Sequence, residues 1–277
     1  MTTAHRQFAA IEEGDVHYRC AGLGASGRPL ILLHPSPASS RVFLPLLKDL
    51  AKDRTAIAPD TLGNGDSCPP ASDAPDLADY ADSMLRLMDA LAIDEFDIYG
   101  SHTGSHIGIE MALQAPARVK TLTLHGVALM DRAEQVLFLE RYAPAVEPDA
   151  IGGQLNWAWH FVRDQMIFYP HFHKDAAHLR VGGDFSAEYL HELTVEVLKN
   201  LGHYQKTYQA VFRHDVLARL AKVTQPIALL THADEPLAAA VEPIRTACPG
   251  VQVLNLNDES PRSVGTAIRA FLAAAED

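Results

Sequence analysis

The sequence has few cysteines, fewer basic than acidic residues and no long apolar run. Its three cysteines, Cys20, Cys68 and Cys248, are an odd and scattered set without C-x-x-C spacing, so they indicate neither a disulfide framework nor a thiolate metal site. Lysine and arginine number 23 against 35 acidic residues, and the net charge of −12 argues against nucleic acid or an anionic membrane surface as a partner. No apolar stretch approaches the roughly 18 residues of a membrane span.

The remaining composition is that of an ordinary globular chain of enzyme size. Its 277 residues are 48% hydrophobic and 21% charged, which is enough for one large core with an inserted subdomain. The first residues, Met1 to Phe8, lack the basic-then-apolar order of a secretion signal, so we expect a cytoplasmic protein. We expect a small-molecule substrate as its partner, with no nucleic acid and no membrane, and the sequence is compatible with a homodimer.

Short apolar runs alternate with helical patterns along most of the chain. The predicted strands are 30–33, 55–58, 96–99, 122–124, 227–230 and 251–256, with an antiparallel edge strand at 16–20. Helical periodicity falls at 77–91, 104–114, 241–247 and 263–274. Because near-continuous apolar strands separated by helices are buried on both faces, this order predicts an α/β fold with a mostly parallel, twisted sheet flanked by helices.

Residues 127–213 interrupt that alternation. They are rich in aromatic residues and histidine, and their periodicity is helical at 136–142, 156–168, 187–200 and 204–212. We therefore predict a helical lid at 127–213, inserted into a core formed by 1–126 and 214–277. No repeat, low-complexity tract or long linker divides the sequence into independent domains.

The run Tyr99-Gly100-Ser101-His102-Thr103-Gly104 joins a predicted strand to a predicted helix. Two glycines bracket its central residue, as in the G-x-S-x-G nucleophile elbow, where the turn is so tight that only glycine fits at the flanks. His102 occupies the place of the serine. Because a side chain at the tip of such a turn projects into the cleft at the carboxyl edge of the sheet, His102 is the first candidate catalytic residue.

Three further segments extend this pattern. His34-Pro35-Ser36-Pro37 follows the first buried strand, residues 57–67 read I-A-P-D-T-L-G-N-G-D-S, and residues 226–237 carry a strand and an acid-bearing turn. With the elbow, and in this order, they resemble the α/β-hydrolase superfamily, in its epoxide hydrolase and haloalkane dehalogenase branch. The resemblance implies the α/β-hydrolase fold with its inserted helical lid. It also implies an oxyanion hole made by the backbone N–H groups of Ser36 and Thr103, and a cis peptide bond before the second proline of the loop.

The sequence departs from that family at the catalytic positions. The elbow carries histidine instead of serine, aspartate or cysteine, and no histidine occurs beyond His232, so a serine–histidine–acid triad is absent on this alignment. We expect instead that a carboxylate orients the imidazole of His102. The candidate catalytic acids are Asp234 and Glu259, with Asp258 as an alternative. The competing interpretation is that these acids are solvated loop residues and that the elbow no longer catalyses.

Substrate contacts are expected on both sides of the cleft. The candidates are His34, Ser101, Trp159, His160, Arg163 and Tyr204. In the related epoxide hydrolases and dehalogenases, lid Trp and Tyr side chains grip the substrate, although most lid aromatics would simply pack together. His171 and His173 suggest a metal, but no third ligand stands at a recognisable spacing, so we expect no metal and no cofactor.

An imidazole that titrates near neutrality beside an oxyanion hole points to general acid/base chemistry. We therefore expect a cofactor-independent enzyme that acts on a small, partly apolar molecule, with hydrolysis by an activated water favoured. Lyase chemistry (C–C, decarboxylative or retro-aldol cleavage) is the first alternative. A non-catalytic, ligand-binding pseudoenzyme and a cofactor-free oxygenase also remain open.

Overall fold

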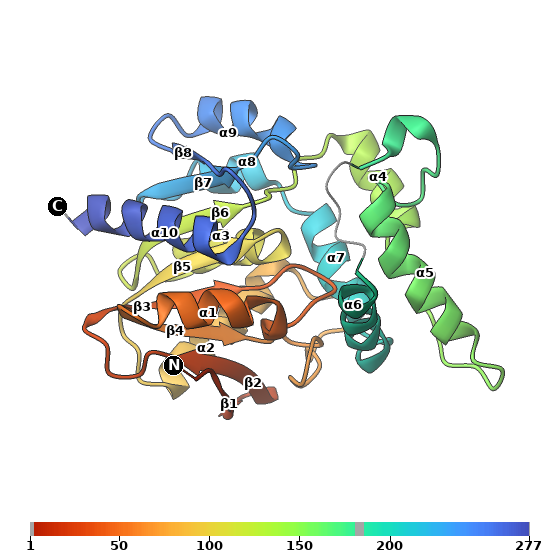
Figure 1. The fold of residues 1–277 in the computed structure, drawn as a ribbon, viewed down its shortest axis with the longest axis horizontal. Coiled ribbons are helices and arrows are strands. Elements are labelled where there is room, and N and C mark those ends of the chain that lie inside the picture. Colours follow the sequence, from red (N-terminus) through yellow and green to blue (C-terminus); the bar gives the residue numbers. More distant parts are fainter. Residues whose placement is uncertain (1–2, 181–185, 277) are drawn as a thin grey trace.

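The computed structural model describes residues 3–180 and 186–276. In this part of the chain, eight strands form one sheet in the order β1-β2-β4-β3-β5-β6-β7-β8 (Figure 1). The strands are β1 His5–Ile11, β2 Gly14–Ala21, β3 Gly27–Leu33, β4 Arg54–Pro59, β5 Phe96–Ser101, β6 Val119–His125, β7 Ile227–Thr231 and β8 Gln252–Asn255. β2 is antiparallel to β1 and to β4, and all pairs from β4 to β8 are parallel.

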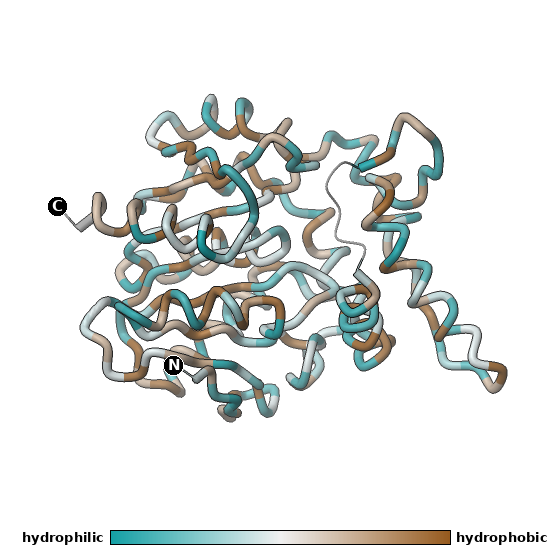
Figure 2. Tube along the Cα trace, in the orientation of Figure 1, coloured by the Kyte–Doolittle hydropathy of each residue, from teal (hydrophilic) through white to brown (hydrophobic). Residues whose placement is uncertain are grey.

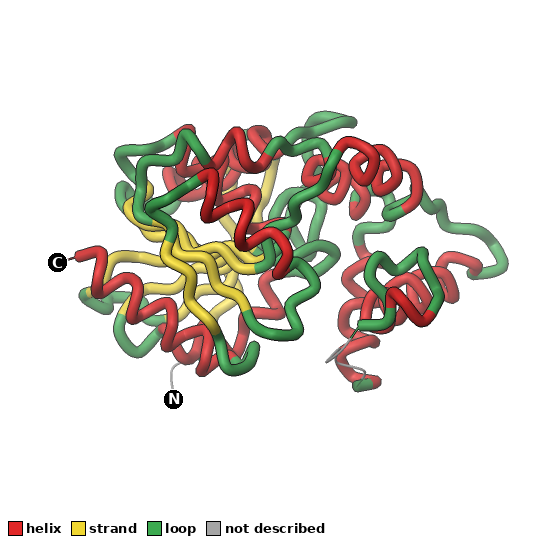
Figure 3. Tube along the Cα trace, turned by 90° about the horizontal axis from the view of Figure 1, so that it is seen from above, coloured by secondary structure: helices red, strands yellow, loops and turns green. Residues whose placement is uncertain are grey.

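Helices cover both faces of this sheet (Figure 3). One face packs against α1 (Leu44–Leu50) and α10 (Pro261–Glu276), and the other against α2 (Leu77–Ala90), α3 (Thr103–Gln114), α8 (Val216–Leu220) and α9 (Val241–Ala247). Short 3-10 turns lie at η1 Ser40–Phe43, η2 Ala176–His178 and η3 Ala238–Ala240. Successive residues of a strand point to opposite faces, so β3 sends Leu30 to one apolar core and Ile31 to the other. Both cores follow the apolar strands that run through the centre of Figure 2.

The segment between β6 and β7 carries four more helices. They are α4 (Arg132–Arg141), α5 (Gly153–Ile167), α6 (Ala187–Lys199) and α7 (Tyr204–Phe212), and they lie together beyond one end of the strands (Figure 1). Asp131 begins α4 through a reciprocal capping box with Glu134, and Ser186 caps α6. We refer to residues 127–213 as the insertion. The boundaries of the lid at 127 and 213 stay a prediction.

The predicted fold class is confirmed. All six parallel strands and the antiparallel strand at 16–20 are present, and the helices predicted at 204–212 and 241–247 have the bounds observed for α7 and α9. β1, α1 and α8 were not predicted. Ser36-Pro37 is a cis peptide bond, as the resemblance implied. Among the described residues, no helix is both long and apolar enough to cross a membrane.

Candidate active site

The elbow between β5 and α3 holds His102 in a backbone conformation that few non-glycine residues adopt. Its φ is 51° and its ψ is −111°, and its N–H donates to the carbonyl oxygen of His125 at 2.7 Å. A Cβ atom on Gly104 would overlap the carbonyl of Leu33, and one on Gly100 would overlap the helix backbone. The glycines therefore allow the turn to close, and the imidazole at its tip is 41% exposed.

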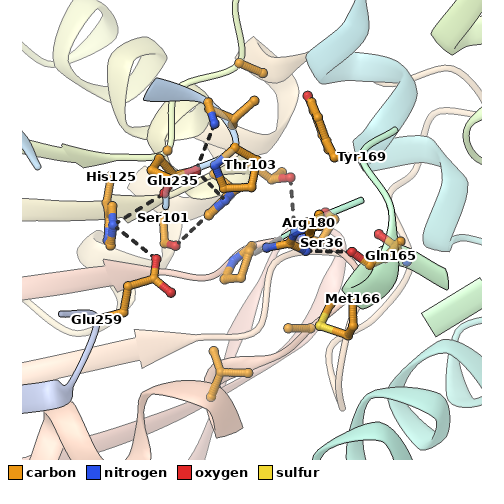
Figure 4. A pocket seen from close by; sticks show the side chains of 18 of the residues that line it. Ser36, Ser101, Thr103, His125, Gln165, Met166, Tyr169, Arg180, Glu235 and Glu259 are labelled. Atoms are coloured by element: carbon orange, nitrogen blue, oxygen red, sulfur yellow. Dashed lines mark hydrogen bonds and ion pairs between the residues drawn. The ribbon is translucent and has the colours of Figure 1, made fainter. Parts of the chain in front are cut away.

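The imidazole lines a cavity of about 650 Å³ that lies between the carboxyl edge of the sheet and the insertion. Loops that follow β3, β5, β6, β7 and β8 form one wall, and side chains from the insertion form the other (Figure 4). The insertion contributes mainly aromatic and aliphatic groups: Phe138, Tyr142, Val162, Met166, Tyr169, Tyr189, Leu193, Tyr208, Val211 and Phe212, together with Gln165 and Arg180. The cavity thus has a polar floor and a largely apolar roof.

Two side chains flank the imidazole of His102. Its Nδ1 lies 3.2 Å from the Oγ of Ser101, and its Nε2 lies 3.8 Å from Oε1 of Glu235, a carboxylate that is only 2% exposed. Gly126 faces the ring, where a Cβ would come within 2.7 Å of Cε1. The ring therefore has a fixed position, with a buried negative charge behind it.

Glu235 belongs to a group of four titratable side chains that we call the histidine–glutamate cluster: His125, His232, Glu235 and Glu259. Oε2 of Glu235 lies 3.7 Å from Nε2 of His125 and 3.6 Å from Nε2 of His232. Oε1 of Glu259 lies 3.6 Å and 2.8 Å from the same two nitrogens. Burial, reinforced by the neighbouring His102, lowers the pKa of His125 to about 4, so its imidazole is neutral at physiological pH.

Three groups in the described residues have the composition and spacing to hold a metal ion. One is the histidine–glutamate cluster, and the other two are His173 with Asp175 and His178, and His17 with Asp60 and Asp66.

The loop after β3 is held against both the elbow and the insertion. The N–H of Ser36 donates to Oγ1 of Thr103 at 3.3 Å, and the hydroxyl of Ser36 donates to Thr207 on α7 at 2.9 Å. The Tyr208 hydroxyl donates to the carbonyl oxygen of Ser36 at 2.9 Å. Ser36 and Thr103 therefore stand side by side at the cavity wall, next to the positive end of the α3 dipole.

The two predicted acids lie at the cavity but do not contact His102 as expected. Asp234 is exposed, and its backbone N–H donates to Nδ1 of His232. Glu259 reaches His232 and His125 instead of the elbow. Among the described residues, the carboxylate within 4 Å of His102 belongs to Glu235, one residue beyond Asp234. In the structure the carboxylate that faces His102 is therefore that of Glu235, the residue next to the predicted Asp234 in the same turn.

Of the six predicted substrate contacts, only Ser101 lines the cavity. His34 is buried outside it, with Nδ1 2.9 Å from the carbonyl oxygen of Pro35 and Nε2 accepting from the N–H of Thr61 at 3.0 Å. Burial lowers the pKa of His34, so its imidazole is neutral. Its hydrogen bonds connect the loop after β3 to the loop after β4. Tyr204 is also buried, and its hydroxyl donates to the carbonyl of Pro144.

The other three predicted contacts lie on α5 but outside the cavity lining. Trp159, His160 and Arg163 are absent from the cavity lining, and Arg163 instead pairs with Asp164 at 2.8 Å. α5 presents a different set to the cavity: Val162, Gln165 and Met166. His125, His232 and Glu235 were missed as well, although the run Thr-His-Ala-Asp-Glu at 231–235 already marked a turn rich in titratable groups.

The sheet order, the elbow after β5 and the inserted helices between β6 and β7 are those of an α/β-hydrolase fold. The sequence model of the alpha/beta hydrolase fold family matches residues 28–258, and the chain belongs to this family.

Individual relatives resemble parts of the chain. A fluoroacetate dehalogenase from a Burkholderia species is 30% identical over 165 residues, which cover 58% of this chain and 50% of the relative. A 2-hydroxymuconate semialdehyde hydrolase from a Pseudomonas species is 36% identical over 109 residues, covering 37% and 38%. The chain therefore spans half or less of the length of these relatives. The crystal structure of a hydrolase from Pseudomonas aeruginosa has a TM-score of 0.74 at 21% identity, covering 97% of this chain and 98% of that one, and shows the shared fold.

Proposed function

We propose that this protein is a hydrolase of small, partly apolar molecules in which His102 is the general base. The observation that carries the proposal is the presentation of an imidazole at the elbow tip, 41% exposed to a cavity of about 650 Å³ and backed by the buried carboxylate of Glu235. A serine at that position would attack the substrate itself. An imidazole there is better suited to activate water.

The reaction then follows from the groups around His102. The imidazole takes a proton from a water molecule, and the resulting hydroxide attacks the electrophilic carbon of the substrate. The imidazolium lies 3.8 Å from Glu235, whose charge stabilises it as the acid does in a catalytic triad. The electron pair of the substrate carbonyl moves onto its oxygen, which would accept hydrogen bonds from the N–H of Thr103 and from the N–H of Ser36 once that group leaves Oγ1 of Thr103. The tetrahedral intermediate then collapses: the carbonyl double bond re-forms, the bond to the leaving group breaks, and the imidazolium gives its proton to that group.

The aromatic side chains of the insertion support the proposal that the substrate is small and partly apolar. Aromatic side chains on α4 and α7 pack into one cluster over the cavity: Phe138 lies 5.3 Å from Phe212 between ring centroids, and Tyr142 lies 5.2 Å from Tyr208. Such a wall favours apolar groups. We therefore propose that the insertion acts as the lid of the active site.

The first experiment uses a panel of substrates suggested by the relatives and by ordinary esterases: fluoroacetate, 2-hydroxymuconate semialdehyde and p-nitrophenyl acetate. For any compound that the protein turns over, we expect His102→Ala to lower kcat about 10²- to 10⁴-fold, the range typical of a lost general base. Its melting temperature should match that of the wild type, because the ring is part-exposed and makes no buried hydrogen bond. Turnover in ¹⁸O-labelled water should place the label in the product.

Two results would count against the proposal. Cleavage without incorporation of ¹⁸O would indicate lyase chemistry with the same imidazole. Undiminished turnover by His102→Ala, together with covalent capture of a serine by a fluorophosphonate, would show that another residue is the catalyst. A matched Ser101→Ala variant identifies that residue if it is the neighbour of His102.

A further inference from the structure

We propose that the histidine–glutamate cluster is a binding site for a divalent transition-metal ion, with Zn²⁺ as the ion that fits it best. The donors are Nε2 of His125, Nε2 of His232, Oε2 of Glu235 and Oε1 of Glu259, which all lie within 4.8 Å of one another. They come from the ends of β6 and β7 and from the loop after β8, which are neighbours in the sheet. The inference concerns binding alone and does not depend on the proposed hydrolysis.

The spacing of the donors matches that of a four-coordinate site. The four nitrogen–oxygen distances between the histidines and the glutamates are 3.7, 3.6, 3.6 and 2.8 Å. Donors placed tetrahedrally at about 2.1 Å from a zinc ion stand about 3.4 Å apart. These four distances and the 4.8 Å limit on the remaining two donor pairs are compatible with a single ion between the side chains after side-chain adjustment.

Three of the four donor atoms are buried without a hydrogen-bond partner. They are Nε2 of His125, Oε2 of Glu235 and Nε2 of His232, the last of which lies 2.8 Å from Oε1 of Glu259 without hydrogen-bond geometry. The side chains of His125 and Glu235 are 5% and 2% exposed, and unsatisfied polar atoms at such depth are rare and costly. All three atoms face the same point, as Figure 4 shows for His125 and Glu235. One cation at that point would satisfy them together.

The charge of the cluster also favours a cation. Glu235 and Glu259 bring two carboxylates to one spot, and their ion pairs within 4.0 Å, in the described part of the chain, are all with histidines. In the described part of the chain, no lysine or arginine forms an ion pair with Glu235 or Glu259. Burying a carboxylate without a compensating charge is unfavourable, and a divalent ion would neutralise the pair.

The surroundings of the two imidazoles differ. Nδ1 of His125 lies 3.0 Å from the hydroxyl of Tyr99, whose oxygen can accept a hydrogen bond from Nδ1–H and so leave the Nε2 lone pair facing the cluster. The N–H of Asp234 donates to Nδ1 of His232 at 3.2 Å, so in the metal-free protein that ring carries its proton on Nε2. Coordination through Nε2 moves this proton to Nδ1 and breaks the contact with Asp234. His232 is thus the ligand that changes most on binding.

The experiment measures binding of Zn²⁺ and Mn²⁺ to chelator-treated full-length protein by calorimetry and by equilibrium dialysis, without substrate. We expect one equivalent of Zn²⁺ per chain and weaker binding of Mn²⁺, because imidazole nitrogens favour zinc. Glu259→Gln should weaken Zn²⁺ binding by at least about tenfold, because it removes a charged ligand. Glu259 is 54% exposed, so this variant should fold like the wild type.

Asp258→Asn is the matched control. It changes the adjacent acid of the same loop, whose Oδ1 accepts from the N–H of Ser260 at 2.8 Å and is not a donor of the cluster. It should leave Zn²⁺ affinity unchanged. The proposal is overturned if the wild type binds no Zn²⁺, if Glu259→Gln and Glu235→Gln both bind it normally, or if His178→Gln abolishes binding and so assigns the ion to the group at 173–178. Because no substrate is present, failure of the hydrolysis proposal changes none of these results.

Discussion

The loops at the carboxyl edge of the sheet and the helices of the insertion meet across one cavity, yet they contribute different kinds of side chain. The edge loops supply titratable groups in mutual polar contact, namely the part-exposed His102 and the buried His125 and Glu235. The insertion supplies aromatic rings in mutual contact, and its charged pairs are mostly at the surface, as for Arg41 of the core with Glu192 of α6.

This difference suggests that the edge loops carry the catalytic groups and that the insertion determines which substrates bind. Positioned charges need rigid supports, and parallel strands fixed on both sides provide them. Apolar contacts need shape and area but little directional precision, so they can be carried by helices that are linked to the core at their two ends only. Changes in the edge loops should therefore act on stability and kcat, and changes in the insertion should act on KM.

The largest expected effect is on stability, at Asp60 in the loop after β4. Its buried carboxylate accepts from His17 at 2.7 Å, from the N–H of Ser40 at 2.7 Å and from the N–H of Asp66 at 2.9 Å. We expect Asp60→Ala to lower the free energy of unfolding by about 3–5 kcal/mol, because it leaves these donors buried and unpaired. Urea unfolding at pH 7 measures the loss.

The control for Asp60 lies in the insertion. Asp164 is also buried, but its partners Arg163 and Lys174 are exposed and would be solvated if it were removed. Asp164→Ala should cost about 1 kcal/mol, and an equal loss in both variants would contradict the contrast between the two regions.

The contribution of Asp60 should also depend on pH in a defined direction. Burial alone would raise its pKa, but the hydrogen bonds from His17 and from the N–H groups of Ser40 and Asp66 lower it to about 2. A carboxyl with a depressed pKa stabilises the folded state above its unfolded value of about 3.8, and that stability is lost as the pH falls toward 2. The difference between wild type and Asp60→Ala should therefore be constant above pH 5 and should narrow below pH 4.

Glu235 should give the next largest effect, on catalysis. Glu235→Gln keeps the shape of the side chain and removes the charge that faces the imidazolium of His102. We expect kcat to fall about 100-fold with little change in KM, since the interaction strengthens only as the ring becomes charged. Asp234→Asn is the comparison variant, one residue away. If it lowers kcat more than Glu235→Gln does, the acid predicted from the sequence is the functional one after all.

The sequence predicts most of the fold because its signals are local. A strand buried on both faces must be continuously apolar, which marks residues 30–33 and 96–99 unambiguously. β1 gives no such signal, because His5–Ile11 is largely exposed and is held by backbone pairing with β2. α8 has only five residues, too few for a helical period to appear.

The site likewise has one part that the sequence predicts and one part that it does not. His102 is predictable because the glycines that force the turn are adjacent to it in the sequence. The histidine–glutamate cluster is not, because its members are separated by up to about 130 residues and meet only through the order β6-β7-β8 in the sheet. A search for metal ligands by sequence spacing cannot find such a set. On α5, both faces carry aromatic or apolar residues, so periodicity does not reveal which face meets the cavity.

Met166 tests the selective role of the insertion. It lies on α5, half-buried, and lines the cavity roof. We expect Met166→Ala to raise KM about tenfold for an apolar substrate while kcat stays the same, because about 1–1.5 kcal/mol of apolar contact is lost equally in the ground state and the transition state. Leu155→Ala, on an exposed position of the same helix, should change neither constant. A fall in kcat with unchanged KM would place Met166 with the catalytic groups.

The smallest expected effect is at Arg163 on α5. The sequence suggested Arg163 as a substrate contact, whereas in the structure its guanidinium pairs with Asp164 outside the cavity lining. Arg163→Gln should therefore change kcat/KM less than about twofold and cost at most about 1 kcal/mol of stability, as for other part-exposed ion pairs. Steady-state kinetics beside Met166→Ala checks this, because the two residues lie three positions apart on one helix. A tenfold rise in KM for Arg163→Gln would mean that Arg163 contacts the substrate, as the sequence predicted.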